Sequence, residues 1–262
     1  MPPVPRVKIG IPRQKDTYMG YIPFNTFIRH FKTEETTHKL KTHTSINPKG
    51  KFYVDSDSRD EVFEKYTHAI SKKESLTILE LPQNKTTKLR ADFDFKFNEI
   101  KPFFSHFYSN DMVKECVRAY RTAIGECLVQ VDNTVYIHEK KSPRTEEGFI
   151  KDGFHIVFPY IGVKQPVFDK IFERATEIIE QKKVFSNLST VSEVCDPISK
   201  SPWLMYGSAK DVGKEPYLCT YGLDSDEGKI ESPSDPIRAF SIFTDKEAEL
   251  KPNINLEPYT RK

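Results

Sequence analysis

Apolar residues recur at helical spacing in three long stretches of the chain. They fall three or four positions apart over residues 57–71, 110–130 and 166–183, a period typical of a helix with one face against a core. Ser109 supplies an N-cap before the second stretch, and Pro166 suits the first turn of the third. The pattern therefore predicts three amphipathic helices separated by other elements.

Shorter apolar runs, typical of β-strands, lie around and between these helices. They cover residues 51–54, 76–81, 89–97, 134–138, 154–158, 191–197 and 204–206. We expect Pro159 to end the fifth run, and the strands at 76–81 and 89–97 to form a hairpin that brings Glu80 near Asp92. The order of strands and helices predicts an α+β fold, with helices packed on one face of an open sheet and polar residues on the other.

The run from Leu89 to Phe97 alternates strictly after Ala91 between apolar and charged residues. Alternate residues of a strand share a face, so the phenylalanines point into a core. Asp92 and Asp94 then stand side by side on the other face, about 6–7 Å apart. Two adjacent carboxylates repel each other, and a bound divalent cation is the usual reason for such a pair.

Composition and charge limit the chemistry only loosely. A net charge of +2 over 262 residues permits a polyanionic partner without requiring one. The four cysteines include no C-x-x-C pair, which excludes a zinc knuckle and favours reduced thiols. The sequence contains no run of about 18 apolar residues and no signal-peptide pattern, so we expect an intracellular protein without a membrane partner.

Three further polar features lie on or beside the predicted strands. They are Lys151 and His155 at the start of one strand, Asp196 at the end of another, and the turn with Ser208 and Lys210. Taken singly, these residues are more often a core or surface histidine and a turn aspartate, and the Ser208 turn lacks the full spacing of a phosphate loop. Together with the aspartate pair they form an inventory for nucleotidyl transfer: three carboxylates for two metal ions, and cations and a hydroxyl for a triphosphate.

Taken in order, these motifs resemble those of the archaeo-eukaryotic primase superfamily. The matching segments are Leu-Arg-Ala-Asp-Phe-Asp-Phe at 89–95, Asp-Gly-Phe-His-Ile-Val-Phe-Pro at 152–159, Val-Cys-Asp-Pro-Ile at 194–198 and Trp-Leu-Met-Tyr-Gly-Ser-Ala-Lys at 203–210. More narrowly, they resemble the primase half of viral helicase–primases of large nucleocytoplasmic DNA viruses, the vaccinia and African swine fever type. The motifs span roughly the central half of the chain.

The resemblance implies a role for each matched residue. Asp92, Asp94 and Asp196 would ligate Mg²⁺ or Mn²⁺, and His155 would contact the phosphates of the incoming nucleotide. The other residues of the implied nucleotide site are Lys151, Ser208 and Lys210. Arg90 joins them because it shares the face of Asp92 by alternation. The second motif usually reads Ser-x-His; Gly153 stands at the serine position here, and its backbone N–H is a possible substitute for the hydroxyl.

The resemblance also implies an architecture and partners. The fold would be an archaeo-eukaryotic primase fold, with an RRM-like mixed sheet, helices on one face and an N-terminal α/β subdomain. We expect an N-terminal part at 1–75, a catalytic core at 76–223 and a C-terminal extension at 224–262. The partners would be single-stranded DNA, nucleoside triphosphates and a helicase part of the same longer polypeptide, in a viral replication factory of the host cytoplasm. The basic loop 140–151 is the candidate DNA contact.

Primer synthesis on single-stranded DNA is therefore the leading hypothesis. A catalytically weak module that positions DNA for a helicase is the alternative, because Gly153 departs from the motif. An Asp-x-Asp phosphatase is disfavoured because Lys96 stands where that class has Thr or Val. A rolling-circle endonuclease is disfavoured because the sequence has no His-x-His pair.

Overall fold

Two antiparallel sheets, one large and one small, form the framework of the protein. The computed structural model describes residues 21–33, 41–82, 86–98, 105–146 and 148–256. The larger sheet follows the order β11-β10-β5-β7-β4-β8, with β6 paired to β7 outside this path. Its strands are β4 (Thr87–Phe97), β5 (Val135–Glu139), β6 (Arg144–Glu146), β7 (Phe149–Val163), β8 (Cys195–Asp196), β10 (Leu218–Leu223) and β11 (Lys229–Ile230). Helices packed on antiparallel sheets confirm the predicted α+β class. Every pairing between the described strands is antiparallel, where a mixed sheet was expected.

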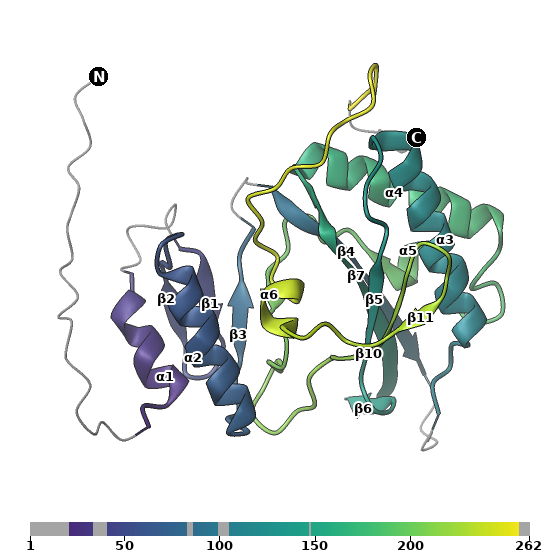
Figure 1. Cartoon of the computed structure of the whole chain (residues 1–262). Helices are drawn as coiled ribbons and strands as arrows, with labels where there is room; N and C mark the ends of the chain where they lie inside the picture. The colour runs from purple at the N-terminus through teal and green to yellow at the C-terminus, as the bar shows by residue number, and fades with distance from the viewer. Residues whose placement is uncertain (1–20, 34–40, 83–85, 99–104, 147, 257–262) are drawn as a thin grey trace.

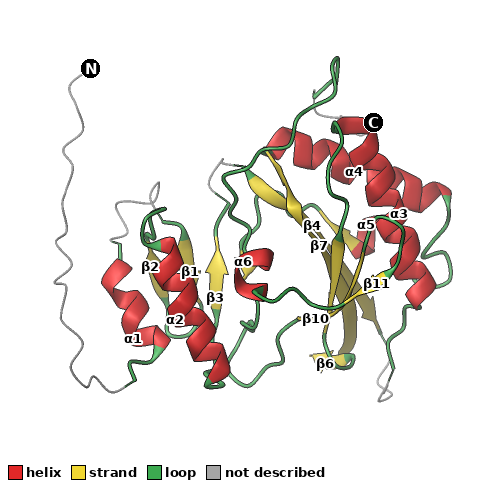
Figure 2. Cartoon of the chain, in the orientation of Figure 1, coloured by secondary structure: helices red, strands yellow, loops and turns green. Residues whose placement is uncertain are grey.

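Two long helices, α3 (Asn110–Cys127) and α4 (Gln165–Gln181), pack on one face of the larger sheet (Figure 2). The inward residues of β4 meet them in the core: Phe93 and Phe95 are at most 1% exposed. The Phe93 ring stacks on Phe154 of β7 at 4.5 Å between centroids. Asp92 and Asp94 alternate with these rings and stay partly exposed. The strand alternation therefore confirms the predicted division into a core face and a polar face.

The smaller sheet carries its own hydrophobic core. Its order is β2-β1-β3-β9, and helix α1, the 3₁₀ turn η1 and helix α2 lie beside it (Figure 1). The elements are α1 (Phe24–Phe27), η1 (Ile28–Phe31), β1 (His43–Ser45), β2 (Gly50–Phe52), α2 (Arg59–Ser71), β3 (Ile78–Glu80) and β9 (Trp203–Leu204). Strand β9 comes from far along the chain, so the smaller sheet is completed by a segment that lies between β8 and β10 of the larger sheet.

A C-terminal segment around helix α6 (Pro236–Phe240) joins the two units (Figure 1). Glu80 of β3, which is fully buried, accepts hydrogen bonds from Ser241 Oγ at 2.6 Å and Ile242 N at 2.8 Å. Lys88 of β4 donates to the carbonyl oxygens of Arg238 and Ala239 at 2.6 and 3.0 Å. Both sheets are thus tied to the same short segment. Burial raises the pKa of Glu80, against the opposing effect of Ser241 and Ile242.

Three expectations for individual elements were wrong. Strands β3 and β4 do not form a hairpin, because β3 pairs with β1 and β9 in the smaller sheet. Strand β7 continues past Pro159, which lies where the register with β4 shifts between Lys88 and Leu89, so its missing N–H costs no ladder hydrogen bond. Residues 191–197 begin as a helical turn, α5 (Val191–Val194), and only then pair as β8.

Among the helices that the structure describes, none has the length and apolar character needed to cross a bilayer.

We predict that Glu80→Ala destabilises the protein by about 2–4 kcal/mol, because a buried hydroxyl and a buried N–H lose their acceptor. Glu80→Gln keeps one carbonyl acceptor and should cost less. Chemical denaturation measures both, with the exposed Glu231→Ala as the matched control. An unchanged midpoint in Glu80→Ala would show that the C-terminal segment does not depend on this contact.

Candidate metal and nucleotide site

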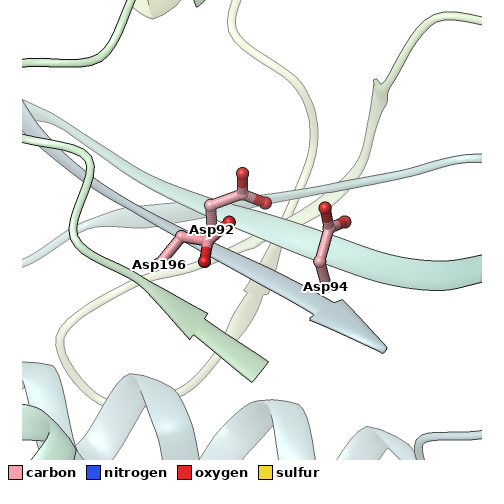
Figure 3. A group of neighbouring side chains, drawn as sticks. All are labelled: Asp92, Asp94 and Asp196. Carbon is pink, nitrogen blue, oxygen red and sulfur yellow. The ribbon is translucent and has the colours of Figure 1, made fainter. Parts of the chain in front are cut away.

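Three aspartates meet on the polar face of the larger sheet. Asp92 and Asp94 project from β4, and Asp196 projects from β8, where it pairs directly with Asp92 (Figure 3). One carboxylate oxygen of each lies within 4.8 Å of the others. The structure thus brings together the three carboxylates that the sequence analysis grouped, although more than a hundred residues separate the third from the other two.

A transverse row of polar side chains continues from these carboxylates across the sheet. Asp196, Asp92, His155, His138 and Cys219 occupy successive paired positions on β8, β4, β7, β5 and β10. Residues directly opposite in an antiparallel pair share a face, so the register itself aligns them. Burial lowers the pKa of His138 to about 3, so that ring is a neutral member of the row.

Asp92 is the most constrained of the carboxylates. The Nε2 atom of His155 lies 3.1 Å from its Oδ1 atom, yet this buried oxygen has no hydrogen-bond donor of good geometry among the described residues. Burial acts to raise the pKa of Asp92, but the charge of His155, followed by Lys210 and Arg144, outweighs it and lowers the pKa. A buried carboxylate oxygen without a donor fits coordination of a cation.

The pKa of Asp196 is shifted in the opposite direction, upward. Burial, followed by the charges of Asp92 and Asp94, raises its pKa, against the weaker effect of Lys96 and Lys210. Like charges so close together disfavour full ionisation in the absence of a counter-ion. The donor set of three carboxylates suits Mg²⁺ or Mn²⁺, which prefer oxygen ligands.

Aromatic rings hold His155 from two sides. Its imidazole lies 4.6 Å from the Trp203 ring and 3.7 Å from the Tyr217 ring, between centroids. The Tyr217 hydroxyl donates to Asp94 Oδ1 at 3.4 Å. Burial, then the charges of Asp94 and Asp92, raise the pKa of Tyr217 well above its usual value, so the hydroxyl keeps its proton. Tyr217 lies in no motif and has no periodic pattern around it, so the sequence alone gives no signal for this contact.

Two residues of the implied nucleotide site are enclosed by protein. Arg90 is 1% exposed: its guanidinium lies 5.3 Å from the rings of both Phe168 and Trp203 and donates to the carbonyl oxygens of Lys88 and Ile198 at 3.1 and 3.4 Å. In this structure Arg90 therefore supports Trp203 behind the site and does not line it.

Ser208 is the second enclosed residue, at 2% exposure. Its hydroxyl lies 2.8 Å from the Tyr66 hydroxyl and accepts from Ile78 N at 2.9 Å. These contacts bind the turn after β9 to the smaller unit. Burial explains why neither Arg90 nor Ser208 presents a polar atom to a ligand, a property that side-chain alternation alone does not reveal.

The two predicted lysines remain near the carboxylates. Lys210 is exposed, and its charge acts on both Asp92 and Asp196. Lys151 shares the polar face with Lys96, its partner in the β4–β7 register, and its Nζ lies 2.8 Å from Glu146 Oε2. Glu146 Oε1 also pairs with Arg144 at 2.8 Å. The acidic residue of the β6–β7 hairpin therefore neutralises part of the basic loop.

The close approach of β4 explains why a glycine, and not the usual serine, stands at position 153. A Cβ atom at this position would lie 2.2 Å from the backbone oxygen of Phe93 and 3.1 Å from Asp94 Oδ1, so serine does not fit without a shift of the strand. The Gly153 N–H donates to Asp152 Oδ1 at 2.9 Å, so it is already engaged and does not replace the serine hydroxyl. The expectation that this N–H serves the phosphates is not supported by the geometry.

Comparison with known proteins agrees with this arrangement. The family model described as "C962R protein N-terminal AEP domain" matches residues 42–223. The protein named "Putative helicase 121R" of Invertebrate iridescent virus 3 is 28% identical over 228 residues, which cover 80% of this chain and 24% of that protein. "Putative helicase L207/L206" of Acanthamoeba polyphaga mimivirus is 27% identical, over 72% of this chain and 20% of that protein.

The chain thus spans a quarter or less of the length of these relatives. The family match covers most of the chain and includes the three aspartates and His155. The resemblance found in the motifs and the fold of the two sheets point the same way. The chain belongs to the C962R-type N-terminal domains of the archaeo-eukaryotic primase superfamily, the primase-type domain of viral helicase–primases.

Proposed function

We propose that this domain synthesises short primers on single-stranded DNA by nucleotidyl transfer with Mg²⁺ or Mn²⁺. The convergence of Asp92, Asp94 and Asp196 within 4.8 Å is the observation that carries the proposal. A pair of divalent cations held there would activate the attacking 3′-hydroxyl and stabilise the leaving pyrophosphate. The orphaned Oδ1 of Asp92 supports a metal ligand at the centre of the group.

The protein's own groups would orient the nucleotide. His155, fixed between Trp203 and Tyr217, presents its imidazole beside Asp92, where it would donate to a phosphate oxygen. Lys210 would add positive charge on the exposed side of the carboxylates. Arg90 would act through Trp203, by fixing the ring on which His155 rests.

A catalytically weak DNA-positioning module remains the second candidate, because Gly153 replaces the usual serine. Glycine here has a structural cause, the approach of the Phe93 carbonyl, so the departure does not by itself indicate lost catalysis. The helicase names of the relatives, of which this chain covers a quarter or less, support a helicase part elsewhere in a longer polypeptide. A viral replication factory in the host cytoplasm is the proposed location.

Asp92→Asn and Asp94→Asn should each lower primer synthesis roughly 100- to 1,000-fold, because each removes a charged metal ligand worth several kcal/mol in the transition state. Incorporation of labelled nucleotides on a single-stranded template with Mn²⁺ measures the loss. Asp226→Asn, an exposed aspartate away from the group, is the matched control. Full activity in the double variant of Asp92 and Asp94 would refute the proposal.

Metal binding can be tested without turnover. Mn²⁺ at about 100 times its Kd should stabilise the wild-type protein by about 2.7 kcal/mol, seen as a rise in Tm. The Asp92→Asn/Asp94→Asn double variant should show no such rise, because it lacks two of the three carboxylate ligands. An equal Mn²⁺ shift in both proteins would place the metal elsewhere.

Gly153→Ser should reduce activity and stability although it restores the usual Ser-x-His motif. The added Cβ meets the Phe93 carbonyl, so β4 must move, at a cost of about 1–3 kcal/mol. Gly125→Ser is the control, because a Cβ at that helical position meets nothing within 4 Å. A more active Gly153→Ser protein of unchanged Tm would show that the strands separate easily here.

A further inference from the structure

Cations from two separate segments gather beside the three carboxylates. Lys140 follows the end of β5, Arg144 begins β6, and Lys210 lies in the turn after β9. The charges of Arg144 and Lys210 act on Asp92, and Lys140 interacts with Asp94. Arg144 and Lys210 also act on Lys140 itself, so the three cations face a common region.

Lys140, like the exposed Lys210, lacks a counter-ion among the described residues. It makes no ion pair within the described part of the chain, whereas Arg144 and Lys151 both pair with Glu146. Its ammonium lies 4.9 Å from the centre of the Tyr217 ring, the same ring that contacts His155 and donates to Asp94. Lys140 is thus connected to the carboxylate site through one aromatic side chain.

The free protein holds this ammonium at an electrostatic cost. Burial, followed by the charges of Arg144 and Lys210, lowers the pKa of Lys140 to about 8, against the opposing effect of Glu146 and Asp94. A half-buried lysine facing two other cations is unfavourable until an anion lies among them. The aspartates do not fill that role, because they face one another and suit cations.

We propose that Lys140, with Arg144 and Lys210, binds the β- and γ-phosphates of a nucleoside triphosphate. The assignment rests on the proposed function, since it places the polyphosphate beside the metal-binding carboxylates. It differs from the earlier expectation that the loop 140–151 contacts DNA. Within that loop Glu146 neutralises Arg144 and Lys151 in part, while the unpaired Lys140 is turned to the site and is only partly exposed.

The next residue, Lys141, provides a matched control. It has the same charge and the same neighbourhood in sequence, but it is exposed and contacts none of the described residues of the site. A DNA backbone bound along this loop would interact with the charges of both lysines. A polyphosphate bound beside the carboxylates would interact with Lys140 alone. The two side chains therefore separate the two ligands.

The experiment measures binding of a nucleoside triphosphate, the matching monophosphate and single-stranded DNA, with Ca²⁺ in place of the catalytic metal. Lys140→Ala should weaken triphosphate binding roughly 10- to 100-fold, the effect of one charge-assisted contact, and leave monophosphate binding unchanged. Lys141→Ala should leave both unchanged. Thermal melting checks that each variant is folded, and inorganic tripolyphosphate should compete with the triphosphate in the wild type and in Lys141→Ala, and more weakly in Lys140→Ala.

Lys140→Arg adds a readout that a structural role would not produce. At pH 8 the free Lys140 is partly deprotonated, and an adjacent polyphosphate favours the charged form, so binding takes up protons. Calorimetry in buffers of different ionisation enthalpy should detect this uptake in the wild type. The arginine variant should keep the triphosphate affinity and show less uptake, because arginine is always charged.

Several results would overturn the assignment. They are equal triphosphate affinity in Lys140→Ala and the wild type, equal losses for mono- and triphosphate, or a loss confined to DNA binding. The proposed function is judged separately. A wild-type protein that binds triphosphate through Lys140 but makes no primers would refute primer synthesis alone, and a primer-synthesising protein indifferent to Lys140→Ala would refute the phosphate site alone.

Discussion

The pairing of β4 with β7 is the constraint on which the site depends. Their register runs from Phe97 opposite Ile150 back to Leu89 opposite Phe158 without interruption. It sets Asp92 beside His155 and Asp94 beside Gly153, while the alternate residues carry the stacked rings of the core. A slip of one residue would turn the carboxylates into the core and the phenylalanines into solvent. Burying the carboxylates and exposing the phenylalanines are both unfavourable, so this register, and with it the geometry of the polar face, is fixed.

The same pairing explains why charge is segregated within the site. The ladder places the acidic residues together at the β8 end of the row, where burial and mutual repulsion act on Asp196 and the neighbouring cations act on Asp92. The cations arrive from outside the two central strands, on the β5–β6 segment and the turn after β9. The site thus has a group of carboxylates beside a group of cations, and neither charge is fully neutralised within the protein. Such a site suits a ligand made of a metal cation and a polyphosphate.

Local pattern was sufficient for the three longer helices and for the polar face of β4. Helices α2, α3 and α4 follow the 3.6-residue period, and the alternation in β4 separates Asp92 and Asp94 from the core. Pairing partners were harder to predict, because a strand's pattern does not say which strand it meets: β3 was assigned to β4 and pairs with β1 and β9. The turn that closes over His155 with Tyr217 has no period at all, so only the folded chain reveals that contact.

The burial of Arg90 and Ser208 shows a further limit and leads to the role of the smaller sheet. Alternation places Arg90 on the correct face, yet Trp203 covers it, and Trp203 belongs to β9 of the smaller sheet. Ser208 binds the same segment to Tyr66 of α2 and to Ile78 of β3. The backbone of Trp203 is therefore held by the smaller sheet, while its ring packs in the core of the larger sheet, from which the imidazole of His155 also comes. The site lies at the junction of two hydrophobic cores, and its geometry depends on how firmly they are joined. Glu80 and Lys88, which bind one C-terminal segment from opposite sheets, supply that junction with buried hydrogen bonds far from any reacting group.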